Sequence, residues 1–248
     1  MRETRLMMGM PITIEVPGSD GSAAIAAAFD WFQAVDRRFS PYKPTSEVSA
    51  LNRGDIAPEH ASDEMREVLA LAETTRWETR GFFDIRRPDG TIDPSGLVKG
   101  WAIRKAAQLI AGAGHADYCV EAGGDIQCAG GNGRGEPWRI GIRNPFNPGE
   151  SVKTLQPGDA GVATSGSYVR GAHIYDPHAP ESELSEIVGI TVVARDIYDA
   201  DRFATAAFAM GPEGIAFIDA TDGLEGYAID RHGVATMSRG FSRVVAPC

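Results

Sequence analysis

The sequence predicts an α+β fold in a single domain of 248 residues. Segments with strand periodicity and segments with helical periodicity follow one another without the regular βαβ alternation of parallel α/β proteins. Hydrophobic residues make up 43% and charged residues 23% of the chain, as is ordinary for a globular protein. A chain of this length buries one large core, so we expect one domain spanning residues 1–248.

Helices are predicted where apolar residues recur every three or four positions after a typical start residue. Ser22 precedes such a pattern and is expected to cap it, and Ser62 is followed by acidic residues, which stabilise the positive end of a helix. The predicted helices cover 22–39, a short stretch around Val48 and Leu51, 62–72, a segment from Lys99 to Gly112 or Gly114, about 200–211, and a segment that opens at Pro212.

Strands are predicted where apolar and polar residues alternate or where β-branched residues gather. The expected strands are 1–16, 118–122, 138–142, 187–194, 227–230 and 234–237, the last two forming a hairpin at His232-Gly233. Residues 147–159 are polar and contain Pro and Gly, which favours a loop.

Charge and composition exclude several classes of function. The net charge of −10 disfavours a nucleic-acid partner, because the phosphate backbone is itself negative. The chain has no apolar run near the roughly 20 residues of a membrane helix, and its start lacks the apolar core of a signal peptide. We therefore expect a cytoplasmic protein. Its three cysteines, Cys119, Cys128 and Cys248, fit no zinc spacing and no disulfide framework.

Residues 93–103 form the most informative segment, because a loop runs into a helix there and carries an acid, two glycines and Lys99. Such a junction offers backbone N–H groups, backbone carbonyls and an ammonium group to one ligand. On its own, the same pattern is more often an ordinary helix start with a solvated lysine.

A second segment places Asp201 and Thr205 four residues apart, on one face of the predicted helix. A carboxylate and a hydroxyl are oxygen ligands of the kind that Mg²⁺ prefers. Asp199 competes for the same role, and an isolated pair of this kind more often stabilises its own helix.

Two further segments carry turn and proton-transfer residues. Gly123-Gly124-Asp125 follows a predicted strand and indicates either a tight turn or a close approach of the backbone to a ligand. Thr164-Ser165-Gly166 is followed by His173, whose imidazole can accept a proton at neutral pH. The G-x-S-x-G motif of many serine hydrolases is absent.

In their order along the chain, these motifs resemble the ApbE family, the FAD:protein FMN transferases. The matching stretches are Met8-Gly9, 39–42, 46–52, 82–84, 93–100, 123–125, 164–166, 173–177, 191–194 and 201–205. Met10 stands where the family has threonine, and the stretch between Asp84 and Asp93 is shorter than in longer members, which bears on the shape of the FAD pocket.

The resemblance implies a large mixed sheet flanked by helices, and Mg²⁺-dependent transfer of FMN from FAD to a threonine of an acceptor flavoprotein, with release of AMP. Gly96, Asp201 and Thr205 would hold Mg²⁺, and His173 would activate the acceptor hydroxyl. The FAD site would be formed by Met8, Tyr42, Phe82, Phe83, Asp84, Asp93, Lys99, Gly123, Gly124, Asp125, Thr164 and Ser165.

Two other functions use the same residues. A pyrophosphatase would cut FAD into FMN and AMP with water as the acceptor, and the short stretch before Asp93 would admit that water. A non-catalytic FAD-binding protein would keep the glycines, but the intact pair Asp201 and Thr205 argues against it.

Overall fold

The structure, a computed structural model, describes residues 1–18, 21–166 and 174–247. An eight-stranded sheet forms its centre, in the order β1-β2-β3-β4-β7-β8-β9-β10. The predicted α+β class is confirmed. All pairings between neighbouring strands of this sheet are antiparallel rather than mixed, and short turns join β1 to β2, β3 to β4 and β9 to β10. The strands are β1 (Arg2–Met7), β2 (Met10–Glu15), β3 (Tyr118–Ala122), β4 (Asp125–Ala129), β7 (Ala160–Gly166), β8 (Ile187–Ala194), β9 (Glu225–Asp230) and β10 (Ala235–Met237).

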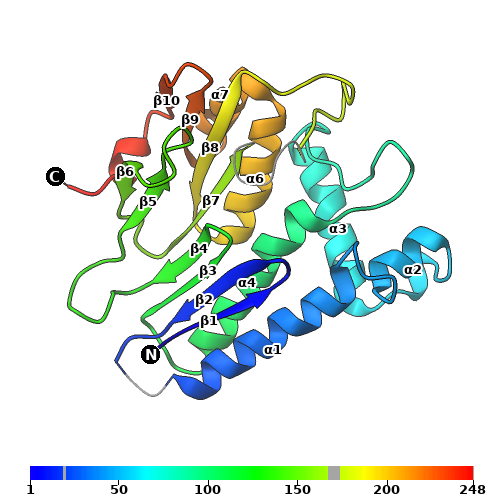
Figure 1. The fold of residues 1–248 in the computed structure, drawn as a ribbon, viewed down its shortest axis with the longest axis horizontal. Coiled ribbons are helices and arrows are strands. Elements are labelled where there is room, and N and C mark those ends of the chain that lie inside the picture. Colours follow the sequence, from blue (N-terminus) through cyan, green and yellow to red (C-terminus); the bar gives the residue numbers. More distant parts are fainter. Residues whose placement is uncertain (19–20, 167–173, 248) are drawn as a thin grey trace.

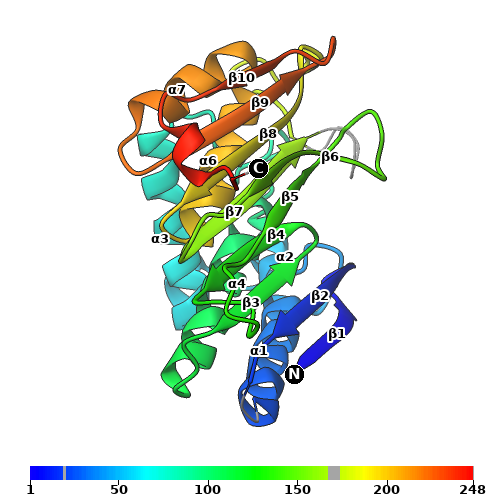
Figure 2. The same cartoon turned by 90° about the vertical axis from the view of Figure 1, so that its left-hand side faces the viewer.

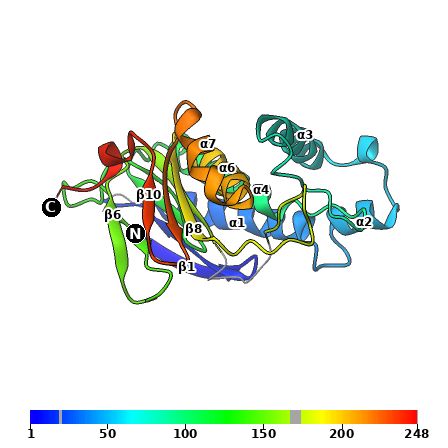
Figure 3. The ribbon, with the colours of Figure 1, turned by 90° about the horizontal axis from the view of Figure 1, so that it is seen from above.

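Helices cover one face of this sheet (Figure 1). Seen from above, α1, α4, α6 and α7 lie beside the sheet, and α2 and α3 lie farther out (Figure 3). Helix α4 packs between α1 and α6. The helices are α1 (Ser22–Phe39), α2 (Glu47–Arg53), α3 (Asp63–Glu78), α4 (Ser95–Gly112), α6 (Ile197–Ala209) and α7 (Gly214–Ala220), with short 3₁₀ turns at Pro58–His60, Gly211–Glu213 and Phe241–Val244. In the described parts of the chain, every helix is too short or too polar to cross a membrane.

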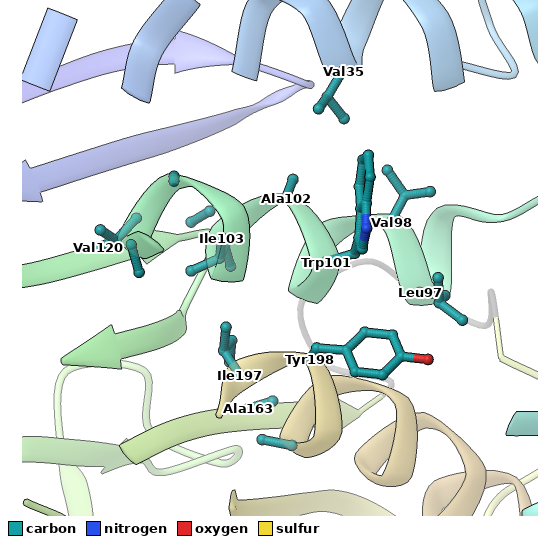
Figure 4. Packing of buried hydrophobic residues seen from close by; sticks show 14 of the residues in the cluster. Val35, Leu97, Val98, Trp101, Ala102, Ile103, Val120, Ala163, Ile197 and Tyr198 are labelled. Atoms are coloured by element: carbon teal, nitrogen blue, oxygen red, sulfur yellow. The ribbon is translucent and has the colours of Figure 1, made fainter. Parts of the chain in front are cut away.

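The larger core lies between the sheet and the helices and is centred on α4. Trp101 is fully buried, with its ring centroid 5.0 Å from that of Trp31 and 5.4 Å from that of Phe39. Figure 4 shows Trp101 on the side of α4 that faces Val35 of α1, and Tyr198 of α6 on the opposite side. Because α4 is held from both sides, its first two turns have a fixed position next to α6.

A smaller core covers the other face of the sheet. The two-stranded sheet of β5 (Ile140–Arg143) and β6 (Ser151–Leu155) packs there with the C-terminal 3₁₀ turn (Figure 2). In this core, the ring of Phe241 stacks on that of Tyr227, with their centroids 5.3 Å apart. Along β8, Val192 faces the helices and Val193 faces this second core. A strand covered on both faces is apolar throughout, which explains the continuous apolar run that predicted it.

Most predicted helices are confirmed, with corrections at their starts. The N-cap residue of α1 is Gly21, and Ser22 is the first residue of the helix rather than its cap. The Ser62 hydroxyl does cap α3 and accepts from the Met65 N–H at 3.2 Å. Helix α4 starts at Ser95, four residues before Lys99, so the ligand-type motif lies inside the helix. Helix α6 starts at Ile197, earlier than predicted.

The strand predictions err where the pattern is polar or glycine-rich. The first 16 residues form two strands joined at Met8-Gly9 rather than one. The predicted loop 147–159 contains β6, and neither β4 nor β7 was predicted. The C-terminal hairpin of β9 and β10 is confirmed.

Candidate active site

A cavity of about 590 Å³, a size typical of small-molecule sites, lies beside the start of α4, the middle of α6 and the end of β7. Its walls come from the β1–β2 turn, the segment after α1, the stretch 82–95, the first turns of α4, the end of β7 and the middle of α6. Most of the predicted site residues line it: Met8, Tyr42, Phe82, Phe83, Asp84, Asp93, Gly96, Lys99, Gly123, Thr164, Ser165, Asp201 and Thr205. Gly124 and Asp125 do not line it.

The three predicted metal ligands, which we call the oxygen cluster (Gly96, Asp201 and Thr205), lie where α4 meets α6. A Cβ atom added to Gly96 would lie 3.6 Å from Cγ2 and 3.9 Å from Oγ1 of Thr205. The Asp201 carboxylate accepts a hydrogen bond from the Gly100 N–H at 2.8 Å, one turn farther along α4. Two segments about a hundred residues apart in the sequence therefore meet at this point.

The oxygen cluster fits a magnesium ion. It combines a backbone carbonyl, a carboxylate and a hydroxyl, and Mg²⁺ prefers oxygen ligands and keeps waters or phosphate oxygens in its shell. The Ser165 hydroxyl lies 3.4 Å from that of Thr205. Among the described residues, no three His, Cys, Asp or Glu side chains form a metal-binding group, so a cation here would depend on backbone and hydroxyl oxygens as well.

Asp199, the competing candidate, forms an ion pair on the side of α6 away from the cavity lining. Its carboxylate bonds Arg202 at 2.7 Å, and Arg202 also contacts Glu78 of α3. Asp199 does not line the cavity, whereas Asp201, one turn of α6 before Thr205, does.

Lys99 lies beside two buried carboxylates. Its ammonium group contacts Asp125 and is 3.3 Å from Oδ1 of Asp201, and both aspartates are 2% exposed or less. Burial raises the pKa of Asp201 to about 7, and the charge of Asp125 acts in the same direction. Lys99 and the Gly100 N–H favour the ionised form and oppose that rise in pKa.

This raised pKa predicts a pH dependence for the metal-free protein. The pKa of Asp201 rises on folding from its ordinary 3.8 to about 7, so the folded state holds more protons than the unfolded state between these values. The contribution of Asp201 to stability is therefore lost as pH rises from about 4 to about 7. In urea unfolding with EDTA, the free energy of unfolding should fall more steeply between about pH 4 and pH 7 for the wild type than for Asp201→Asn. Parallel pH curves for the two proteins would contradict this assignment of the raised pKa.

The turn Gly123-Gly124 has φ values of +59° and +96° and joins β3 directly to β4. Glycines suit such a turn because both positions lie in the left-handed region. The tight-turn interpretation is confirmed, and Gly123 also lines the cavity. Met8, in the β1–β2 turn, has a φ of +53° and reaches the same cavity.

The short stretch between Asp84 and Asp93 is a compact hairpin. Asp84 accepts from Arg76 at 2.9 Å and from the Arg86 N–H at 2.8 Å, while Asp93 accepts from the Ser95 N–H at 3.1 Å and pairs with Arg87. The two carboxylates thus hold the wall of the cavity in place, in addition to any contact with a ligand.

The wall also includes residues that the sequence did not single out. Arg87 and Lys43 line the cavity. Arg87 lies near Tyr42, a residue that is 89% exposed, and near Tyr175, which belongs to the matching stretch 173–177. Arg87 stands directly before a Pro88-Asp89-Gly90 turn, between Asp84 and Asp93. A basic residue at this place, between two acids of the matching stretches, is the sequence signal that could have identified it. His173 lies outside the described residues.

Comparison with known proteins decides the family. The model of the ApbE family matches residues 8–87 and 86–228, which is most of the chain. The chain belongs to the ApbE family. Three known proteins illustrate the similarity, two compared by sequence and one by structure.

A curated relative from Vibrio cholerae, named FAD:protein FMN transferase, is 36% identical over 143 residues, which is 54% of this chain and 43% of the relative. One of the same name from Klebsiella pneumoniae is 30% identical over 177 residues, 68% of this chain and 49% of the relative. The matches thus span about half the length of these ApbE relatives. The solved structure of the flavin transferase ApbE from Vibrio cholerae superposes with a TM-score of 0.86 at 25% identity, over 98% of both chains.

Proposed function

We propose that this ApbE-family protein transfers FMN from FAD to a threonine of an acceptor flavoprotein, with Mg²⁺ as the cofactor and AMP as the leaving group. The observation that carries the proposal is the meeting of the oxygen cluster and Lys99 in one cavity, in a fold shared with a flavin transferase. Relatives named FAD:protein FMN transferase support the substrate.

In this proposal, Gly96, Asp201 and Thr205 hold Mg²⁺, which when bound supplies positive charge to the pyrophosphate oxygens. The Lys99 ammonium group, close to the oxygen cluster, adds a second positive charge for the phosphates. Tyr42 and Phe82 offer aromatic surfaces on which the rings of FAD can pack.

In the proposed reaction, one bond to phosphorus forms, one breaks, and one proton is transferred. The acceptor hydroxyl oxygen bonds to the FMN phosphorus, the bond from that phosphorus to the oxygen of AMP breaks, and AMP leaves with the electron pair. The hydroxyl proton passes to a base, a role that we propose for His173 on the family resemblance alone. The cytoplasmic location expected from the sequence stays a prediction.

The test mixes the protein with FAD, MgCl₂ and acceptor flavoprotein domains that carry a target threonine. We expect a fluorescent covalent flavin on the acceptor in a denaturing gel and one AMP per flavin by chromatography. Replacement of the acceptor threonine by alanine serves as the control and should remove the label. Release of FMN and AMP without labelling of the acceptor would indicate a pyrophosphatase instead of a transferase. Unchanged FAD would indicate a non-catalytic FAD-binding protein.

A further inference from the structure

Lys99 has two buried carboxylate neighbours that differ in surroundings. Asp201 lines the cavity and belongs to the oxygen cluster, whereas Asp125 lies outside the cavity lining and is 1% exposed. The Lys99 ammonium group contacts Asp125 directly and lies farther, at 3.3 Å, from Asp201. The positive charge of Lys99 is therefore shared unequally between the two acids.

Asp125 is fixed in place by the sheet. It opens β4 directly after the Gly123-Gly124 turn, and its Oδ1 accepts from the Thr164 N–H of β7 at 3.0 Å. Among the described residues, its Oδ2 has no hydrogen-bond donor besides the Lys99 ammonium group that it contacts. A buried carboxylate oxygen of this kind needs a positive partner, so Asp125 holds Lys99 strongly.

We propose that Asp125 is a positioning residue that draws the Lys99 ammonium group away from Asp201 and so keeps the Asp201 carboxylate available to a divalent cation. The inference rests on the proposed cation site. Without Asp125, Asp201 is the buried carboxylate that still lies beside the ammonium group among the described residues. A full ion pair between them competes with the cation for the same oxygens. Asp125 itself does not touch the cation.

This role makes the effect of Asp125 depend on Lys99. Asp125→Asn is expected to weaken cation binding about tenfold or more, because the ammonium group then pairs with Asp201. In a Lys99→Met background no ammonium group competes, so Asp125→Asn should change the affinity less than about twofold. If Asp125 instead attracted the cation by its own charge, the substitution Asp125→Asn would weaken cation binding by the same factor in both backgrounds.

The experiment measures Mn²⁺ binding by electron paramagnetic resonance, without FAD, for the wild type, Asp125→Asn, Lys99→Met and the double variant. Glu121→Gln is the matched control, because it removes one carboxylate from the neighbouring strand β3 and should leave the affinity unchanged. Equal losses in both backgrounds, or no loss with Asp125→Asn, would overturn the proposal, as would a wild type that binds no Mn²⁺.

A second measurement covers the case in which Asp125→Asn does not fold, as judged by circular dichroism. Lys99→Met alone should then bind Mn²⁺ at least as tightly as the wild type, and weaker binding would overturn the proposal. The Mn²⁺ measurement contains neither FAD nor acceptor, so its outcome does not depend on flavin transfer. Mn²⁺ binding can follow the predicted pattern even in a protein that transfers no flavin.

Discussion

Asp201→Asn is expected to lower the rate of FAD turnover by about 100- to 1,000-fold. Asp201 supplies the one carboxylate of the oxygen cluster, and its oxygens lie next to Lys99 and the Gly100 N–H. An amide of the same size keeps the shape of the side chain but loses the charge that attracts a divalent cation. Steady-state turnover and Mn²⁺ affinity should fall together, while FAD affinity, measured by flavin fluorescence, should change little because the walls of the cavity remain.

Asp199→Asn is the matched control for this prediction. It makes the same chemical change on the same helix, but Asp199 pairs with Arg202 and does not line the cavity. This variant should keep most of the turnover and all of the Mn²⁺ binding. Normal turnover in Asp201→Asn, or an equal loss in Asp199→Asn, would remove Asp201 from its assigned role.

Gly100→Ala is expected to destabilise the fold by about 1–3 kcal/mol and to impair the site. A Cβ at this position would lie 2.8 Å from both the Asp201 Cβ and the Ile197 carbonyl oxygen, and 3.0 Å from Asp201 Oδ2. One of these neighbours is backbone, so α6 must move as a unit to make room. Moving α6 displaces Asp201 and Thr205 relative to Gly96. Urea unfolding and Mn²⁺ binding should both show the loss.

Gly112→Ala tests whether the effect is specific to the contact with α6. Gly112 is the last residue of the same helix, and an added Cβ there has no atom of another element within 4 Å. The free energy of unfolding of Gly112→Ala should equal that of the wild type or exceed it by up to about 1 kcal/mol, because alanine favours the helical backbone. If both variants were as stable as the wild type, the close approach of α4 and α6 at Gly100 would be wrong.

The helices could be predicted because their apolar faces are long and regular. The apolar face of α1 is buried as its spacing indicated, with Ile25, Phe29, Phe32 and Phe39 in the core. Strands β4 and β7 could not be predicted, because most of their buried positions are polar or small. Gln127 of β4 is buried and accepts from the Ile197 N–H at 2.8 Å, a tertiary contact that no periodicity reveals.

The site was predictable in composition but not in arrangement. The motifs named nearly all of the residues that line the cavity, because the ordered set resembled a family with a known chemistry. Spacing within one helix placed Asp201 and Thr205 together, but it could not show that Gly96 lies against Thr205. That contact depends on the packing of α4 on α6 through Gly100. Nor could sequence show that Asp125 lies outside the cavity lining and contacts Lys99.

The central claim is that Gly96, Asp201 and Thr205 bind one divalent cation beside the phosphates of FAD. A crystal structure of the protein with FAD and Mn²⁺, with anomalous diffraction recorded at the manganese edge, tests it most directly. We expect one strong anomalous peak within about 2.3 Å of an Asp201 carboxylate oxygen, the Thr205 hydroxyl and the Gly96 carbonyl, next to the FAD pyrophosphate. A peak bound by other residues, or FAD bound in this cavity without any peak at Asp201, would contradict it.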